Sequence, residues 1–202
     1  MKSKSKFAIL GFSLIVGLAS LQPASSAVTV FADIQTTEKA FDGIYDPVTN
    51  VSGPFSVRFL ADTGGDSLFG FGMLTSFDPS AVQATNAVYG GVWTFFSSQP
   101  VVNNTAGSIE TLANVGFVAP PVSGSAVSLY TVDFSPGLAL ANFNLTNNDY
   151  PSGNQFLDGN GNLVPVTFSP SAIHVVPVPA AIWLMLSSIA GWAWMRTRFS
   201  QS

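Results

Sequence analysis

The chain of 202 residues contains no cysteine and one histidine, and only 9% of its residues are charged. Without cysteine, a disulfide framework, a thiolate metal site and a cysteine nucleophile are excluded. A single histidine excludes a His-rich metal site. Basic residues are almost absent from residues 28–174, where Lys39 and Arg58 face eleven acids, a balance of 2 − 11 = −9. Because phosphate backbones are bound by clustered lysine and arginine, this acidic region argues against nucleic acid as a partner.

The amino end has the pattern of a secretory signal peptide. Three lysines fall within the first six residues, and a mostly apolar run extends from Phe7 to Leu21. Small residues follow, and signal peptidase requires small side chains at positions −3 and −1, which Ser25 and Ala27 provide. Residues 1–27 are therefore predicted to be removed after Ala27 during export. The alternative, an uncleaved membrane anchor, is less consistent with the short run and the processing site.

The carboxyl end carries a second membrane signal. The sixteen residues 180–195 contain no charge, and as a helix they would extend about 24 Å, or more if residues 175–179 are included. Arg196 and Arg198 follow directly, and the positive-inside rule would hold them in the cytoplasm. We predict a transmembrane helix over 180–195 within a tail of residues 175–202. A buried core helix is the alternative that fits the terminal position less well.

The tail also resembles a known sorting signal. VPVPAAIWL matches the variant motif VPxPAAxWL of PEP-CTERM proteins, in which a Pro-x-Pro motif, a hydrophobic helix and basic residues follow one another. Val178 stands where the family's name-giving glutamate occurs, and only two arginines form the basic end. The residues that carry the resemblance are Val176, Pro177, Val178, Pro179, Ala180, Ala181, Trp183 and Leu184.

This resemblance implies recognition by an exosortase, a membrane-embedded transpeptidase-like enzyme of Gram-negative bacteria. The enzyme would cut near Pro177–Pro179 and deliver the body of the protein from the inner membrane to the cell surface or the extracellular matrix. The two prolines have a physical part in this, because they cannot donate backbone hydrogen bonds and disfavour helix before them. They would keep the chain extended where a peptidase needs it.

Residues 28–174 read as one all-β domain. Apolar and polar residues alternate in short runs separated by Gly, Pro, Asn, Asp and Ser, which predicts an antiparallel jelly-roll-type β-sandwich of about nine strands. Thr36–Pro54 is the least regular segment and is predicted to be a loop. The expected strands are Val28–Ile34, Phe55–Phe59, Phe69–Phe77, Ala81–Val88, Trp93–Phe96, Ser108–Phe117, Val127–Val132, Leu138–Leu145 and Leu163–Phe168.

The order of these segments resembles cohesin modules over about residues 54–168. The segments concerned are the strand and Asp-Pro-Ser passage Leu74–Val82, then Gly107–Phe117, Ala126–Phe134 and the turn Leu157–Leu163. The resemblance implies a jelly-roll sandwich of the kind that cohesins share with some carbohydrate-binding modules. An unrelated sandwich is an equal alternative, and a fold by itself does not define a function.

Motifs for catalysis or metal binding are absent from the sequence. Asp158-x-Asn160-x-Asn162 begins like a calcium loop, but Leu163 and Ser169 occupy the positions where that loop needs Gly and Glu. A hairpin turn is therefore the favoured interpretation. His174 precedes the sorting motif on a segment expected to be a tether, which gives an imidazole no rigid setting. We predict no catalytic residue, no metal site and no cofactor.

One aromatic cluster is a candidate ligand platform. Trp93 and Phe95 would share one face of a strand and could stack on a sugar, although alternating aromatics more often belong to a core. The sequence thus predicts an exported, exosortase-sorted, non-enzymatic surface or matrix protein whose sandwich contacts envelope proteins or polysaccharide. Its processing partners would be signal peptidase and an exosortase. The alternatives are a secreted polysaccharide-active hydrolase and a carbohydrate-binding module.

Overall fold

The computed structural model describes residues 27–95, 99–116, 119–136, 142–149 and 156–175. The signal-peptide residues before Ala27, the sorting motif, the helix expected over 180–195, Arg196 and Arg198 lie outside these ranges. No helix within the described residues is long and apolar enough to cross a membrane. The described strands are β1 (Val28–Gln35), β2 (Val48–Val51), β3 (Phe55–Asp62), β4 (Leu68–Ser76), β5 (Val82–Tyr89), β6 (Val101–Asn103), β7 (Ser108–Asn114), β8 (Val127–Pro136), β9 (Asn142–Asp149), β10 (Leu157–Asp158), β11 (Val166–Phe168) and β12 (Ser171–Val175).

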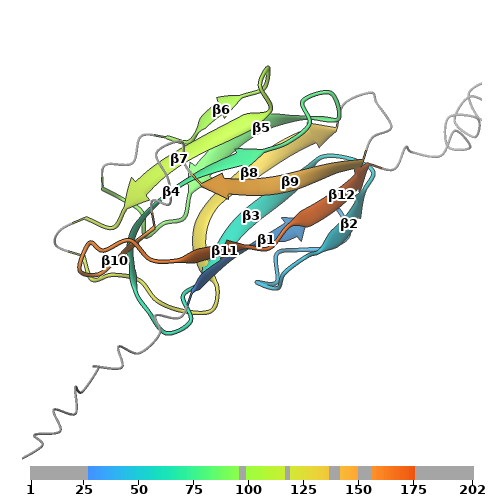
Figure 1. The fold of residues 1–202 in the computed structure, drawn as a ribbon. Coiled ribbons are helices and arrows are strands. Elements are labelled where there is room, and N and C mark those ends of the chain that lie inside the picture. Colours follow the sequence, from blue (N-terminus) through green and yellow to red (C-terminus); the bar gives the residue numbers. More distant parts are fainter. Residues whose placement is uncertain (1–26, 96–98, 117–118, 137–141, 150–155, 176–202) are drawn as a thin grey trace, which may run out of the picture.

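The strands form two sheets packed as a sandwich (Figure 1). The five-stranded sheet has the order β11-β1-β3-β8-β5, and the seven-stranded sheet has the order β2-β12-β9-β4-β7-β6 with β10 paired to β4. In Figure 1, β9 and β12 cross the front of the view, with β3 and β8 behind them. The described chain enters the domain at the start of β1 and leaves it at the end of β12, at opposite ends of the sandwich.

The alternation in the sequence explains which side chains fill the space between the sheets. In β7, Ile109, Thr111 and Ala113 are buried, whereas Glu110 and Leu112 between them are exposed. Aromatic rings dominate the core: Phe59 stacks on Tyr130 with 4.6 Å between ring centroids. The Tyr130 hydroxyl is hydrogen-bonded to that of Thr75 from the opposite sheet. Burial raises the pKa of Tyr130 above its usual range, so the core holds the neutral phenol.

A glycine closes the turn between β6 and β7. Gly107 has a φ of +66°, and a Cβ atom at this position would lie 2.1 Å from the carbonyl oxygen of Phe77. Its own carbonyl accepts a hydrogen bond of 2.8 Å from the Phe77 N–H. Only glycine combines this backbone conformation with so close an approach. The turn sets where β7 begins and thus which of its residues face outward.

The sandwich prediction is confirmed, but several strands differ from expectation. Four described strands were not predicted: β2, β6, β10 and β12. The sheets are also not purely antiparallel, because β1 pairs with β11 and β2 with β12 in parallel. Strand β2 lies within Thr36–Pro54, so the prediction that this whole segment is a loop is wrong. Its four residues pair with β12, a partner more than 100 positions away that local patterns do not reveal.

Two further expectations fail at the ends of elements. Of the described residues 93–95 of the expected strand Trp93–Phe96, only Phe95 forms a bridge, with Asn114. Trp93 instead closes a turn, because its N–H donates to the Gly90 carbonyl oxygen. His174 does not lie on a tether, because Ser171–Val175 forms strand β12 between β2 and β9. The described domain therefore continues through Val175, next to the first residue of the expected sorting motif.

Candidate interaction surfaces

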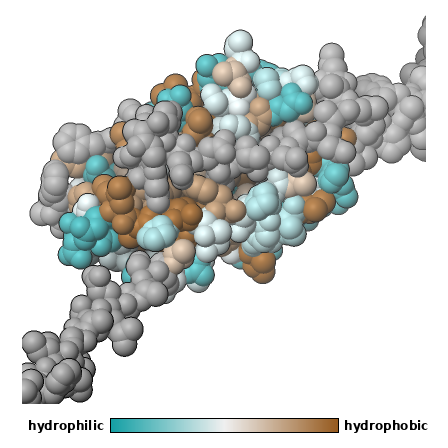
Figure 2. All heavy atoms as spheres, in the orientation of Figure 1, coloured by the Kyte–Doolittle hydropathy of each residue, from teal (hydrophilic) through white to brown (hydrophobic). Residues whose placement is uncertain are grey.

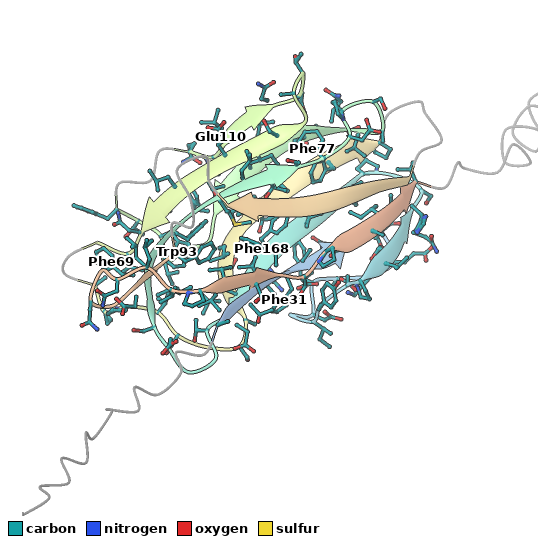
Figure 3. The ribbon with its side chains drawn as sticks, in the orientation of Figure 1. Phe31, Phe69, Phe77, Trp93, Glu110 and Phe168 are labelled. Carbon is teal, nitrogen blue, oxygen red and sulfur yellow. The ribbon has the colours of Figure 1, made fainter. Side chains whose placement is uncertain are left out.

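The outer side of β4, β6 and β7 presents aliphatic side chains around one carboxylate. Leu74 of β4 and Val101 of β6 both pair in register with Glu110 of β7, so the three side chains lie side by side on one face. Val101 is 57% exposed, Leu112 of β7 is 48% exposed and Glu110 is exposed. Figure 3 labels Glu110 on this strand. We call these four residues the β7 face.

The edge of β7 beside this face is already occupied. The Tyr89 hydroxyl accepts a hydrogen bond of 2.9 Å from the Leu112 N–H and donates one of 3.2 Å to the Leu112 carbonyl oxygen. Further along, Phe95 and Asn114 exchange two backbone hydrogen bonds of 3.1 and 3.3 Å. Since an open edge would recruit another strand, these contacts leave the side chains of the β7 face, rather than its backbone, available to a partner.

Apolar residues elsewhere on the molecule are dispersed. In Figure 2, brown residues form several separate groups between white and teal ones on the visible side. Other exposed aliphatic residues are Ile44, Val48, Val88, Val92 and Leu163. Single exposed aliphatic residues are ordinary on protein surfaces. The β7 face differs from them because three of its residues are in register across three strands and Leu112 is the next outward residue of β7.

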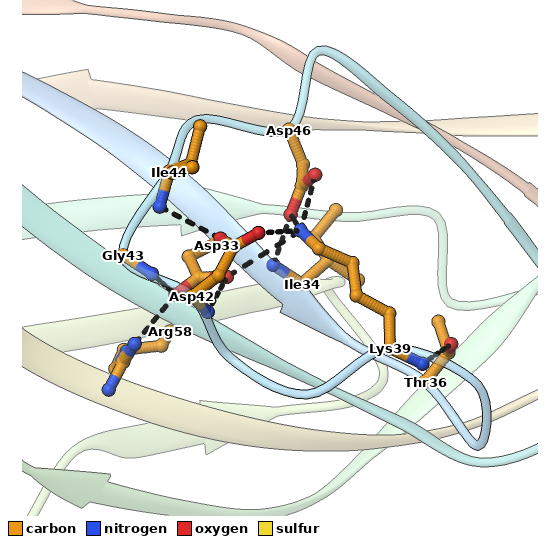
Figure 4. Close-up of polar contacts among 9 residues, drawn as sticks. All are labelled: Asp33, Ile34, Thr36, Lys39, Asp42, Gly43, Ile44, Asp46 and Arg58. Carbon is orange, nitrogen blue, oxygen red and sulfur yellow. Dashed lines mark hydrogen bonds and ion pairs between the residues drawn. The ribbon is translucent and has the colours of Figure 1, made fainter.

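A segment covering the outer side of β1 and β3 contains a buried charge network (Figure 4). We call residues 36–47 the strap. Asp33 of β1 is fully buried, and its Oδ2 accepts hydrogen bonds of 2.6 Å from Arg58 Nη2 and 2.8 Å from the Gly43 N–H. The Phe41 ring lies 4.5 Å from the Arg58 guanidinium carbon. The ion pair joins β1 to β3, and its two residues hold the strap through the backbone bond to Gly43 and the cation–π contact with Phe41.

The strap also protects the edge of β1. The Asp46 N–H donates to the Ala32 carbonyl oxygen at 2.9 Å, and Asp46 Oδ2 accepts from the Ile34 N–H at 2.7 Å. Lys39 Nζ lies 2.7 Å from Asp46 Oδ1. Burial lowers the pKa of Lys39, but the bond to Asp46 and three neighbouring carboxylates outweigh it and raise the pKa above its ordinary value. Asp46 therefore takes the place of a neighbouring strand along this edge.

This network has a consequence for the rest of the surface. Lys39 and Arg58 are the only lysine and arginine of residues 28–174, and both belong to the strap network. The remaining carboxylates of the domain, including Glu110 and Asp133, therefore have no lysine or arginine of the domain left to pair with. A partner that supplies positive charge would meet complementary charge on this surface.

Two adjoining hollows open at the end of the sandwich where β1 and β8 end. The larger, of about 490 Å³, is lined by residues that include Phe55, Ser56, Thr85 and Asp133. The smaller, of about 300 Å³, is lined by Glu38, by residues 50–53 and by others. Thr36, Thr37 and Pro54 line both. We call the two together the end groove.

The candidate platform of Trp93 and Phe95 is not formed. Trp93 is only 2% exposed, its Nε1 donates a 2.6 Å hydrogen bond to the Ser128 carbonyl oxygen, and its ring packs against Phe71 at 4.9 Å between centroids. Phe95 is 38% exposed. The ring of Trp93 therefore belongs to the core and offers no face to a sugar, because the turn from Gly90 directs it between the sheets (Figure 3).

The turn at Asp158 has the geometry of a self-contained loop. Asp158 Oδ1 accepts hydrogen bonds of 2.8 Å from the N–H groups of Asn162 and Asn160, and these bonds lower the pKa of Asp158. Within the described residues, no three Asp, Glu or His side chains lie close enough together to hold a metal ion. The hairpin-turn interpretation of this sequence agrees with these bonds.

No model of a known protein family matches the sequence, and no curated protein matches it either. Solved structures do match. A cohesin from a type I cohesin–dockerin complex of Clostridium thermocellum has a TM-score of 0.57 at 8% identity, with 75% of this chain and 95% of that chain covered. A non-cellulosomal cohesin from the archaeon Archaeoglobus fulgidus has a TM-score of 0.53 at 16% identity, covering 77% and 96%. The domain has the fold of a cohesin module.

A third cohesin match comes from a family 33 glycoside hydrolase of Clostridium perfringens, with a TM-score of 0.53 at 12% identity over 74% of this chain and 98% of that chain. Identities this low concern the fold alone. The cohesin-like sandwich expected from the order of strands and turns is confirmed. Because the cohesin fold accommodates such different sequences, the surface residues of this chain must be interpreted on their own chemistry.

The sequence interpretation missed the residues of the β7 face and the strap network. Leu112 carried a usable signal, because a large aliphatic side chain at an outward position of the alternating segment Ser108–Asn114 is unexpected for a solvated face. The sequence contained no comparable signal for the Asp33–Arg58 pair. Asp33 occupies an outward position of β1, and only the strap, which arrives from outside the strand, buries it.

Proposed function

We propose that this protein is an exported, non-enzymatic interaction module that binds a protein partner of the cell envelope through the β7 face. The observation that carries this proposal is the group formed by exposed Val101 and Leu112 and half-buried Leu74 around Glu110 on a cohesin-type sandwich. The solved C. thermocellum cohesin named above is itself in complex with a dockerin. A protein-binding role for this domain is consistent with that fold.

The chemistry of the β7 face defines the partner. Val101, Leu112 and Leu74 would lose their exposed apolar area on binding, at roughly 25 cal/mol for each Å² removed from water. Glu110 would need a hydrogen-bonding cation in a desolvated interface. The partner is therefore expected to present a Lys or Arg flanked by apolar side chains, and its association is expected to weaken as salt concentration rises.

Replacing Leu112 with aspartate is expected to reduce partner binding at least about tenfold, because a second carboxylate would be buried beside Glu110. The measurement is photo-crosslinking on intact cells from a probe residue at position 101, with crosslinked partners identified by mass spectrometry. Val48→Asp is the matched control, since Val48 is an equally exposed aliphatic residue on edge strand β2. If both variants keep the same crosslinked partner, or both lose it, the β7 face is not the binding site.

We propose further that the tail delivers this module to the cell surface. Two features of the domain support the expected processing sites: β1 begins at Val28, directly after the expected signal cleavage, and β12 ends at Val175, directly before the Val176–Pro179 motif. The folded part would thus remain whole after both cuts. The motif would leave the domain from a strand held on both sides, by β2 and β9.

Deleting residues 176–202 is expected to remove the protein from the cell surface while leaving its export intact, because the sorting helix and motif are lost together. Fractionation with immunoblotting measures the destination, and intact-mass spectrometry of the native protein measures both cleavage points. As a control, Arg196→Lys with Arg198→Lys keeps the positive charge of the tail. An unchanged destination of the deletion variant would rule out the sorting role.

A further inference from the structure

The end groove has dimensions suited to a chain-like ligand. Small-molecule sites have volumes of roughly 300–1,000 Å³. The larger hollow, of about 490 Å³, falls within this range, and the smaller, of about 300 Å³, lies at its lower limit. They adjoin at Thr36, Thr37 and Pro54, which line both. An elongated site of this kind accommodates successive units of an oligomer better than one compact molecule.

The groove combines hydroxyl groups with negative charge. Thr37, Thr85, Ser56 and Ser135 contribute hydroxyls and Gln35 contributes an amide, around a floor formed by Phe55 and Phe134. Pro54 adds an exposed apolar ring. Among the described residues of the lining, the only ionisable side chains are acids, Glu38 in the smaller hollow and Asp133 in the larger. Hydroxyl, amide and carboxylate groups are the side chains that hydrogen-bond the hydroxyls and amines of sugars.

Asp133 is held in a fixed orientation by neutral donors. Its Oδ1 accepts a 2.6 Å hydrogen bond from Ser56 Oγ, and its Oδ2 accepts one of 3.2 Å from Asn86 Nδ2. Ser56, Asp133 and Asn86 are neighbours in register on β3, β8 and β5. Neither donor carries a charge, so these two bonds bring no positive charge next to Asp133. Pre-orientation of this kind lowers the entropy that binding a cation would cost.

A strand irregularity shapes the wall next to Asp133. The pairing of β5 with β8 shifts between Ala84 and Asn86, leaving Thr85 as the extra residue of a bulge. Thr85 Oγ1 donates a 3.2 Å hydrogen bond to the Asp133 carbonyl oxygen and lines the larger hollow. On the other side, Asn104 fastens Ala84 through bonds of 2.8 and 2.9 Å to its N–H and carbonyl oxygen. The bulge is therefore held in place rather than free to relax.

We propose that the end groove binds a polysaccharide that contains free amino sugars. The ammonium group of such a sugar would pair with Asp133, and its ring hydroxyls would bond to the hydroxyl-bearing walls. Charge complementarity favours this ligand, because residues 28–174 carry 2 − 11 = −9 and both cations are engaged in the strap network. An anionic polysaccharide would be repelled by the same surface. This site is separate from the β7 face, so the domain would join a protein to a glycan.

The test measures binding of a glucosamine tetramer to the full chain in detergent by isothermal titration calorimetry. The N-acetylglucosamine tetramer is the matched probe, because it has the same backbone without the positive charges. Asp133→Asn keeps the acceptor for Ser56 and removes the charge, and it is expected to weaken binding of the glucosamine tetramer about tenfold. Glu38→Gln, in the exposed part of the strap, is expected to weaken it as well and does not alter a strand.

Asp62→Asn is the control for general attraction to an acidic protein. Asp62 ends β3, whose first residue Phe55 lines the groove, so the two lie about 23 Å apart along the strand. Asp62→Asn should leave the affinity within about twofold. The proposal is overturned if the tetramer does not bind, if Asp62→Asn weakens binding as much as Asp133→Asn, or if the N-acetylated tetramer binds equally well. Tighter binding of tetralysine would overturn it too, by identifying the groove as a peptide site.

Discussion

Replacing Arg58 with methionine is expected to lower the free energy of unfolding by about 3 kcal/mol. The methionine retains much of the aliphatic stem of Arg58 but removes the guanidinium that bonds to Asp33 at 2.6 Å. Asp33 is fully buried and would keep the N–H groups of the strap, mainly that of Gly43, and the more distant ammonium of Lys39, whose Nζ lies 3.8 Å from Asp33 Oδ1. Leaving a buried carboxylate without its cation destabilises the folded state, because the carboxylate has also lost its hydration. The expected loss of about 3 kcal/mol is at the lower end of the range for buried ion pairs, because the Arg58 side chain is 28% exposed.

Urea unfolding of the full chain in detergent measures this change, with about 6–12 °C in the melting temperature as the corresponding thermal shift. Arg58→Met combined with Asp33→Asn is the informative second variant, because it removes both charges and keeps an oxygen acceptor for the strap. It should lose less stability than the sum of the single changes. An unchanged unfolding midpoint for Arg58→Met would mean that the backbone donors and Lys39 satisfy Asp33 without Arg58.

Replacing Trp93 with alanine is expected to cost about 3–5 kcal/mol of folding free energy. The indole is 2% exposed, packs edge-on against Phe71 and bonds to the Ser128 carbonyl oxygen at 2.6 Å. Its removal leaves a cavity in an aromatic cluster and at the same time removes the hydrogen bond to the Ser128 carbonyl oxygen. This change is larger than the expected effect at Arg58, because close packing between the sheets leaves little room for collapse.

The same urea unfolding measures the loss, and Phe95→Ala serves as the control. Phe95 is two residues away and 38% exposed, so its truncation is expected to cost less than half as much as that of Trp93. If Trp93→Ala keeps the stability of the parent and instead abolishes binding to a glycan, the ring is a ligand platform after all and its position in the core is contradicted.

The positive and negative charges of residues 28–174 lie in different places: both cations are in the strap network, and acids lie on the β7 face and in the end groove. Its two cations within residues 28–174 stabilise the strap, so the acids on the β7 face and in the end groove depend on partners for compensation. Both proposed ligands, a basic protein surface and an amino-sugar polymer, follow from this distribution. Because Leu112 lies on β7 and Asp133 on β8, in different sheets, variants at these two positions should separate the two activities.

The sequence by itself determined the sandwich and the positions of most long strands. Alternation over segments such as Phe55–Asp62 and Ser108–Asn114 fixes which side chains can share one face, because the side-chain period of a strand is two. The scarcity of charge, the absence of cysteine and the patterns from which the terminal signals are predicted also follow from sequence alone, because they are matters of composition and order. None of these depends on which strands become neighbours.

Only the tertiary structure decided what lies on the surface and what is covered. Short strands such as β2 and β12 form because each pairs with a distant partner, and four or five residues carry too little pattern to predict. Asp33 is buried by the strap and not by its own strand, while Trp93 enters the core through a turn. The effect of the scarce basic residues is likewise set by the fold. Lys39 and Arg58 both lie next to Asp33 in one network, so no lysine or arginine of residues 28–174 remains to pair with the acids outside that network.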